Sequence, residues 1–122
     1  MRNYRDLIVW QKSMALVTEV YSITRLFPKE ELYGLVSQTR RSAVSIPSNI
    51  AEGYGRHSTN DYTRFLQIAI GSLYELQTQL EICLNLGYLL KDTFEKAYEQ
   101  SREIERMLSS LIKKVGNYSG TK

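Results

Sequence analysis

The chain has 122 residues and a formal net charge of +3, with 43% hydrophobic and 24% charged residues. This composition is typical of one globular domain and excludes a disordered or collagen-like chain. The small basic excess allows a polyanionic partner without requiring one.

Targeting signals are not evident in the sequence. No run of 18 apolar residues occurs, so no membrane span is expected. Asp6 and Lys12 interrupt the first apolar run, which therefore lacks the layout of a secretion signal. Cys83 is the single cysteine, so a disulfide within the chain is excluded and a reducing compartment fits. We expect a cytoplasmic protein that does not associate with membranes.

The first helix is expected over residues 7–26, with Asp6 as its N-cap and Pro28 beyond its end. Its apolar residues recur at alternating steps of three and four and form two neighbouring stripes. One stripe consists of Leu7, Trp10, Met14, Val17 and Tyr21, and the other of Leu16, Val20, Ile23 and Phe27. Two stripes make a wider apolar surface than packing against a single neighbouring helix requires.

The second helix is expected over residues 30–55, ending at Gly55. Pro47 lies inside it, where proline removes one amide donor and pushes against the carbonyl of Ala43. The apolar stripe keeps its phase through this position, so we predict a kinked but continuous helix. The alternative is one helix that ends at Ser45 and a new helix capped by Ser48.

The third helix is expected over residues 59–86, between a Ser58 cap that resembles a capping box with Asp61 and a stop at Gly87. Gly71 lies in its middle, where glycine costs about 1 kcal/mol relative to alanine. Either a neighbouring backbone approaches closely there, or the glycine is simply tolerated.

The fourth helix is expected over residues 92–115, with Gly116 as its stop and residues 116–122 as a frayed tail. Short turns join all four helices, which predicts antiparallel neighbours. The fold class is therefore all-α, a single domain over residues 1–122 that forms an up-down-up-down four-helix bundle.

Basic residues cluster between the middle of the second helix and the start of the third. Guanidinium groups bind phosphate bidentately and stack on bases, and Tyr54 and Tyr62 lie nearby for stacking on unpaired bases. This pattern predicts a surface that binds RNA or DNA. The alternative is a solvated face whose arginines pair with Glu52 and Asp61. The candidate nucleic-acid-binding residues are Arg40, Arg41, Arg56, His57 and Arg64.

The segment SIPSNIAEG, residues 45–53, surrounds the proline with small polar side chains. It can form a ligand notch, or its Ser and Asn side chains can satisfy carbonyls that the proline releases while another helix packs closely; we favour the second interpretation.

Catalytic and metal-binding patterns are not evident. One histidine, His57, and one cysteine, Cys83, on different elements cannot build a zinc site of ordinary spacing. Glu-x-x-His pairs for a di-iron site do not occur, and GYGR lacks the spacing of a phosphate-binding loop. We therefore expect no metal, no cofactor and no enzymatic activity.

Nine tyrosines, several of them on or beside apolar stripes, suggest that some apolar surface is buried between copies of the chain. A dimer or a ring would both satisfy the symmetry of a homo-oligomer. We assign the predicted oligomer interface to Trp10, Tyr33, Pro47, Tyr54 and Tyr74.

Three segments carry a family resemblance: DLIVWQKSM, FPKEELYGLVSQTRRSAVSIPSNIAEGYGR and FLQIAIGSLYELQTQLEICLNLGY. They resemble the four-helix-bundle proteins encoded within intervening sequences of bacterial 23S rRNA genes, from Asp6 to about Val115. The SIPSNIAEG run is the most specific part.

The resemblance implies a four-helix bundle without enzymatic activity that often forms a homopentameric ring. The related accessory protein of diversity-generating retroelements is similar in fold and pentamer, and binds nucleic acid and a reverse transcriptase through a basic surface. By position, Arg40, Arg41 and Arg56 occupy the family's basic pattern. Gln77 departs from it, since the family usually has Glu there, which puts an ion pair at that position in doubt.

Three functions follow as hypotheses. The leading one is a non-catalytic oligomeric bundle, favoured as a pentamer, that binds RNA or another nucleic acid through its arginines. The alternative is a protein-binding scaffold or accessory subunit without nucleic-acid contact. An enzyme would require a ligand or metal that copurifies with the chain.

Overall fold

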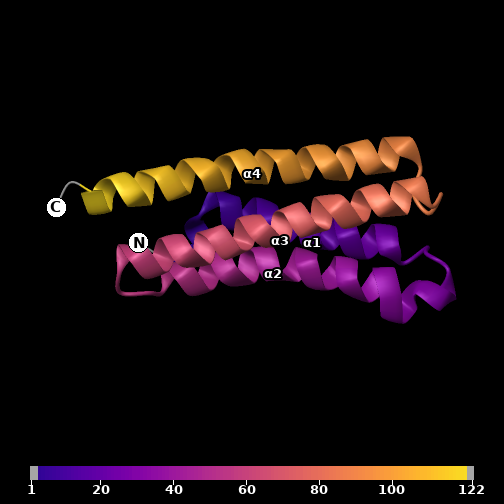
Figure 1. Ribbon diagram of the computed structural model, residues 1–122, viewed down its shortest axis with the longest axis horizontal. Coiled ribbons are helices and arrows are strands. Elements are labelled where there is room, and N and C mark those ends of the chain that lie inside the picture. The colour runs from indigo at the N-terminus through magenta and orange to yellow at the C-terminus, as the bar shows by residue number, and fades with distance from the viewer. Residues whose placement is uncertain (1–2, 121–122) are drawn as a thin grey trace.

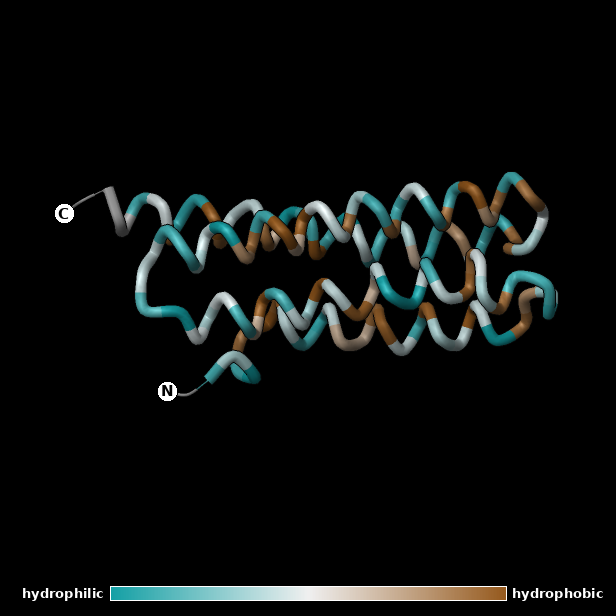
Figure 2. Tube along the Cα trace, turned by 60° about the horizontal axis from the view of Figure 1, so that its bottom comes forward, coloured by the Kyte–Doolittle hydropathy of each residue, from teal (hydrophilic) through white to brown (hydrophobic). Residues whose placement is uncertain are grey.

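The computed structural model describes residues 3–120, which form an antiparallel four-helix bundle (Figure 1). The four helices are α1 (Ile8–Thr24), α2 (Ser37–Tyr54), α3 (Thr59–Asn85) and α4 (Lys91–Gly120). Each helix packs against its neighbours in sequence, and α1 also packs against α4. Hydrophobic and hydrophilic residues alternate along every helix, as expected for amphipathic helices around one core (Figure 2). The predicted fold class is confirmed.

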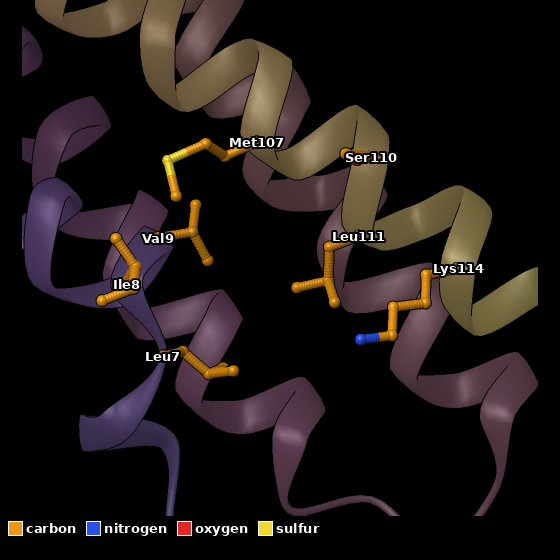
Figure 3. A pocket seen from close by; sticks show the side chains of 7 residues that line it. All are labelled: Leu7, Ile8, Val9, Met107, Ser110, Leu111 and Lys114. Carbon is orange, nitrogen blue, oxygen red and sulfur yellow. The ribbon is translucent and has the colours of Figure 1, made fainter.

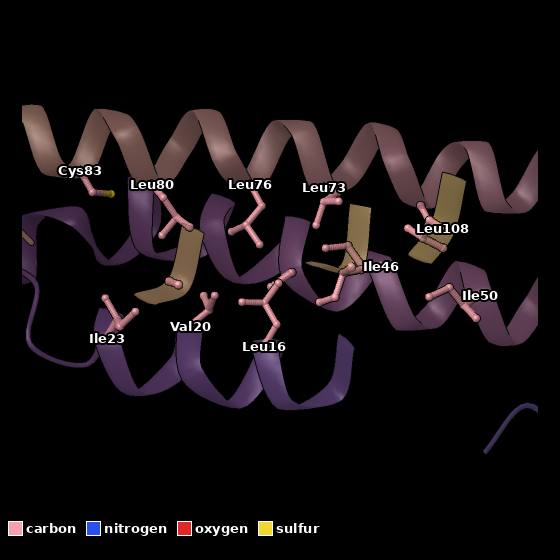
Figure 4. Packing of buried hydrophobic residues seen from close by; sticks show 14 of the residues in the cluster. Leu16, Val20, Ile23, Ile46, Ile50, Leu73, Leu76, Leu80, Cys83 and Leu108 are labelled. Atoms are coloured by element: carbon pink, nitrogen blue, oxygen red, sulfur yellow. The ribbon is translucent and has the colours of Figure 1, made fainter. Parts of the chain in front are cut away.

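The core is built from the apolar stripe of each helix, as Figure 4 shows. Its fully buried large residues include Leu16 and Val20 of α1, Ile46 and Ile50 of α2, Leu73, Leu76 and Leu80 of α3, and Ile104 and Leu108 of α4. Of the two stripes on α1, the one containing Leu16 faces this core. Met14 and Tyr21 of the other stripe remain 43% and 39% exposed. Leu7, Trp10 and Val17 of that stripe are partly buried against the core, so the second stripe forms its partly exposed edge.

The chain before α1 corrects one prediction. Asp6 ends a short 3₁₀ turn, Tyr4–Asp6, and its carboxylate accepts a 3.2 Å hydrogen bond from the backbone N–H of Asn3. The Asn3 side chain accepts in turn from the N–H of Arg5 at 2.8 Å. Leu7 then precedes α1 with an extended backbone and no side-chain cap. Asp6 as the cap of the first helix was therefore wrong, because its carboxylate is engaged one turn earlier.

The segment between α1 and α2 corrects a second prediction. A 3₁₀ turn, Lys29–Glu31, leads into a π-helical turn, Leu32–Val36, in which Gly34 has non-helical dihedrals of φ −111° and ψ −108°. The Glu31 carboxylate accepts the backbone N–H of Leu35 at 3.2 Å. The α-helix that was expected from residue 30 therefore begins only at Ser37.

Pro47 lies within α2, which continues through it to Tyr54 with Gly55 as its C-cap. The alternative of two helices divided at Ser45 was wrong. Pro47 is buried, and the side chain of Asn49 donates a 2.8 Å hydrogen bond to the carbonyl of Ser45. Asn49 therefore bonds to the helix backbone one turn before it, while the carbonyl that Pro47 deprives of a helical donor is that of Ala43.

The ends of α3 were predicted correctly. The Ser58 hydroxyl accepts the N–H of Asp61 at 3.0 Å. Gly87 has φ +79°, and the N–H groups of Gly87 and Tyr88 reach the carbonyls of Leu84 and Cys83 at 3.0 and 2.9 Å. This pairing is a Schellman motif, which explains the glycine.

Of two predictions about glycines, the one for Gly116 was wrong, and for Gly71 the second of the two alternatives holds. Gly116 does not stop α4, which continues to Gly120, so the tail expected from residue 116 is helical as far as the structure describes it. In the described part of the chain, a Cβ built on Gly71 would have no atom within 4 Å apart from those of its chain neighbours and its own helix backbone, so that glycine is simply tolerated. The close approach is at Gly53, where an added Cβ would lie 2.7 Å from the Cβ of Phe65.

Within residues 3–120, none of the helices combines the length and the apolar character needed to cross a membrane.

Candidate functional site

Arg40 holds α2 against the last turns of α1. Its Nε donates a 2.9 Å hydrogen bond to Thr24 Oγ1, and Nη2 lies 3.5 Å from the carbonyl oxygen of Tyr21. Its guanidinium carbon also lies 4.4 Å from the centre of the Tyr21 ring. Arg40 is half-buried, so much of its hydrogen-bonding capacity serves the fold.

Arg41 is turned away from this contact, because consecutive residues of an α-helix are about 100° apart. Its side chain is exposed, and no hydrogen bond or ion pair to another residue of the described chain engages it. Arg41 therefore has its full set of donors available to a ligand.

A cavity of about 470 Å³ lies beside these two arginines, and we call it the Arg–Tyr cavity. Tyr33 at its edge is 92% exposed. None of the residues that line it carries a carboxylate, so its charge is entirely positive. The lining residues are Tyr21, Leu32, Tyr33, Val36, Ser37, Arg40, Arg41 and Val44.

Arg56 and Arg64 lie elsewhere, beside the turn between α2 and α3. Arg56 pairs with Glu52 at 2.7 Å and Arg64 with Asp61 at 3.6 Å. Both guanidinium groups also lie over the ring of Phe65, at 4.7 and 4.6 Å from its centre. These are the ion pairs of the alternative interpretation.

The five candidate nucleic-acid-binding residues are therefore divided between two places. Arg56 lies just beyond the end of α2 and 16 residues after Arg40, which corresponds to about 24 Å along a straight helix. His57 is exposed beside Arg56 at the turn.

An apolar groove of about 370 Å³ runs between α1 and α2, and we call it the α1–α2 groove. It shares Val44 with the Arg–Tyr cavity, so the two hollows lie end to end along one face. The residues that line the groove are Tyr4, Trp10, Met14, Val17, Val44, Pro47, Ser48 and Ala51.

The predicted interface residues do not all lie on this face. Trp10 and Pro47 line the groove and Tyr33 lines the adjoining cavity. Tyr54 packs edge-on against Tyr62, with ring centres 6.0 Å apart, at the α2–α3 turn. Tyr74 faces α4.

The α3–α4 side is joined by polar contacts. The Tyr74 hydroxyl donates to Glu105 at 3.2 Å, and this carboxylate raises the pKa of Tyr74. Gln77 Nε2 donates to Ser101 Oγ at 3.0 Å and to the same Glu105 at 3.3 Å. Gln77 thus makes hydrogen bonds from a neutral amide to α4.

A smaller pocket of about 220 Å³, here called the polar pocket, lies between α2 and α3. In this pocket the Oγ atoms of Ser45 and Ser72 lie 2.8 Å apart and share a hydrogen bond. Glu75 and Gln79 were not anticipated from the sequence, because they read as ordinary polar positions on a helix. Its lining residues are Gln38, Arg41, Ser42, Ser45, Ser72, Glu75 and Gln79.

A fourth hollow, of about 310 Å³, lies between the start of α1 and the second half of α4 (Figure 3). Lys114 is its one charged lining residue, and the others are Leu7, Ile8, Val9, Met107, Ser110 and Leu111.

Neither a metal-binding cluster nor a reactive thiol is found among the described residues. Within residues 3–120, no cluster of three or more His, Cys, Asp or Glu side chains is placed to hold a metal ion. Cys83 is buried, and this burial raises the pKa of its thiol to about 11. The thiol is therefore protonated at neutral pH and is a poor nucleophile.

A comparison with protein families identifies the family of this chain. Residues 5–110 match the family described as 23S rRNA-intervening sequence protein. The chain belongs to this family. The resemblance noted from the three sequence segments is thereby confirmed.

A solved structure agrees with this assignment. The fold is similar to the crystal structure of a protein of unknown function from the S23 ribosomal protein family of Bacteroides thetaiotaomicron VPI-5482. The two chains are 27% identical with a TM-score of 0.79, and the match covers 87% of this chain and 99% of the other. No curated protein matches the sequence.

Proposed function

We propose that this family member is a non-catalytic protein that binds single-stranded RNA or another single-stranded nucleic acid at the Arg–Tyr cavity. The observation that carries the proposal is the composition of this cavity, in which two arginines and two tyrosines meet without a carboxylate. Arg41 is unpaired within the described chain and Tyr33 is almost fully exposed. Such groups bind phosphates and stack on unpaired bases.

The two arginines have different roles in this proposal. Arg41 contacts the phosphate, because its guanidinium is available and exposed. Arg40 keeps the Tyr21 ring and the end of α1 in place, through its contacts to Thr24 and Tyr21. Tyr33 stacks on the neighbouring base, and each such stack contributes about 1–3 kcal/mol.

Arg56, His57 and Arg64 form a second, weaker contact region in this account. The ion pairs Arg56–Glu52 and Arg64–Asp61 are solvent-exposed, and pairs of this kind contribute about 0–1 kcal/mol. A strand phosphate can replace such a carboxylate at little cost, so the pairs do not exclude binding.

We further propose that copies of the chain assemble into a homo-oligomer, with a pentamer favoured, through the α1–α2 groove. Trp10 and Pro47 line this groove, and Met14 in it is 43% exposed. Apolar surface of this kind is typical of interfaces between subunits. A ring would place one Arg–Tyr cavity on every subunit along the same circle.

Light scattering on the purified chain, before and after nuclease treatment, tests both proposals. Five chains of 14.1 kDa give about 70 kDa. We expect an oligomer whose ratio of absorbance at 260 to that at 280 nm falls on nuclease treatment while the protein assembly persists. A monomer free of nucleic acid would contradict both proposals.

A protein scaffold remains the second candidate function, and the α1–α2 groove is the observation that favours it. If the groove binds another protein, the complex resists nuclease and high salt, because apolar contacts are not screened. A partner that is lost on nuclease treatment would count against the scaffold.

A further inference from the structure

The polar pocket between α2 and α3 adjoins the Arg–Tyr cavity, because Arg41 lines both. Arg41 therefore stands on the ridge of α2 between them. A phosphate bound to Arg41 has Tyr33 on one side and the polar pocket on the other. A strand that crosses α2 at this residue can place successive bases on the two sides.

The polar pocket carries one positive and one negative side chain, so it suits a ligand that has hydrogen-bond acceptors on one edge and donors on another. Arg41 of α2 and Glu75 of α3 line it from opposite helices, both are exposed, and no ion pair joins them. Within the described chain neither side chain has another hydrogen-bonding or ionic partner. The pocket thus presents a cation and an anion that are both unsatisfied.

Gln79 adds a second unsatisfied acceptor. Its side chain is only 7% exposed, and its Oε1 has no hydrogen-bond partner. A buried carbonyl without a donor is unfavourable, and its terminal torsion is soft enough to turn toward a ligand. Glu75 and Gln79 together therefore favour a ligand that brings several N–H donors.

We propose that the polar pocket selects guanine. This inference rests on the proposed nucleic-acid binding, because Arg41 is the group that brings the nucleotide to the pocket. Guanine is the base whose Watson–Crick edge carries two adjacent donors, N1–H and N2–H₂, which match the two oxygens of the Glu75 carboxylate. Its O6 and N7 acceptors match the N–H donors of Arg41 that the phosphate does not use, since a guanidinium carries five such donors.

The other bases do not combine two adjacent donors on one edge with two acceptors on another. Adenine and cytosine each place an acceptor beside their single amino group, and uracil places its one N–H between two carbonyls. Each would set a lone pair against the Glu75 carboxylate. A guanidinium or ammonium ligand would satisfy Glu75 but would be repelled by Arg41. The volume of about 220 Å³ suits a single base.

The test compares binding of uridine oligonucleotides that carry one central guanosine, inosine, adenosine or cytidine. For the natural chain we expect about tenfold tighter binding of the guanosine strand than of the adenosine strand. The inosine strand, which lacks the N2 amino group, should fall between them. Glu75→Gln should bring the ratio of the guanosine to the adenosine affinity close to one.

Glu81→Gln is the matched control, because Glu81 is an exposed carboxylate of the same helix that does not line the pocket. It changes net charge equally and should leave the ratio unchanged. Equal binding of all four strands, lowered by Arg41→Ala, would overturn guanine selection while leaving the proposed function intact. Absence of binding to every strand would overturn both.

Free GMP distinguishes the source of the nucleotide. If GMP displaces the guanosine strand from the natural chain but not from the Glu75→Gln variant, a single nucleotide fills the pocket. If guanosine is preferred in the strand and GMP does not compete, recognition requires the neighbouring nucleotides. A Glu75→Gln variant that keeps the full guanosine preference would contradict the pocket assignment.

Discussion

Arg40 Nε lies 2.9 Å from Thr24 Oγ1, and this hydrogen bond joins the second helix to the last turn of the first. Thr24 is buried and its hydroxyl also lies 2.8 Å from the carbonyl of Val20. The neighbouring Arg41 makes no such contact. One arginine of the pair therefore serves the fold and the other is available for binding.

This division predicts different effects on stability. Arg40→Ala should lower the free energy of unfolding by about 1–2 kcal/mol, because it removes a charge-assisted hydrogen bond and the contact with Tyr21. Arg41→Ala should change it by less than about 0.5 kcal/mol. Urea unfolding followed by circular dichroism measures both, and equal effects of the two substitutions would refute the division.

Two helical glycines, Gly53 near the end of α2 and Gly71 in the middle of α3, should respond to alanine in opposite ways. At Gly53 the new Cβ would meet Phe65 at 2.7 Å and Tyr62 at 3.2 Å, so Gly53→Ala should destabilise by about 1–3 kcal/mol. At Gly71 the space is open, and Gly71→Ala should stabilise by about 0.5–1 kcal/mol. Thermal unfolding of the two variants tests this, and destabilisation at Gly71 would show that α3 has a neighbour there.

The buried thiol of Cys83 should make the folded protein less stable in alkaline solution. Burial raises the pKa of its thiol from 9.0 to about 11, and the nearby Glu31 adds to the shift. The unfolded chain therefore releases this proton first, so the thiol's contribution is complete below about pH 9 and is lost as the pH approaches 11. Urea unfolding at several pH values should show a steeper alkaline decline for the natural chain than for Cys83→Ala.

Alkylation provides an independent check on the same thiol. At pH 8, iodoacetamide should react with native Cys83 far more slowly than with the urea-unfolded chain. Equal rates would mean that the thiol is accessible and its pKa ordinary.

If the α1–α2 groove is the interface between subunits, a charged residue in it should prevent formation of the oligomer. Met14→Lys places a charge in the groove and should convert the proposed oligomer to monomers, which light scattering detects. Ile68→Lys is the control, because Ile68 is exposed to a similar degree, 40% against 43%, but lies on α3 outside the groove. Dissociation by Ile68→Lys and not by Met14→Lys would move the interface to another face.

Much of the fold could be predicted from the sequence because it depends on periodicity. The three-four spacing of Leu16, Val20 and Ile23 marks the core face of α1 directly. The helix ends at Ser58 and Gly87 depend only on residues close by in the sequence, and both predicted ends were confirmed. Helix number, order and packing follow from such patterns.

The remaining errors concern residues whose role depends on their neighbours. Asp6 and Gly116 each have a residue type that suits a helix end, yet Asp6 bonds to Asn3 and α4 continues past Gly116. The π-helical turn around Gly34 is accompanied by a hydrogen bond from the Leu35 N–H to the Glu31 carboxylate, which spacing alone does not reveal.

The candidate site was only partly predictable. Adjacency in sequence suggested that Arg40 and Arg41 act together, although neighbours on a helix face different directions. The carboxylate of Glu75 enters the polar pocket only because α3 packs against α2, so no motif in the sequence marks it.

The most direct test of the central claim is the salt dependence of single-stranded RNA binding by Arg41→Ala and by its control, Arg106→Ala. Arg106 is an exposed arginine of α4 that lines none of the three hollows on α2. We predict weaker binding for Arg41→Ala and a slope of log affinity against log salt that is flatter by about 0.7, the value for one phosphate contact on a single strand. Arg106→Ala should bind as the natural chain does. Unchanged affinity and slope for Arg41→Ala would contradict nucleic-acid binding at the Arg–Tyr cavity.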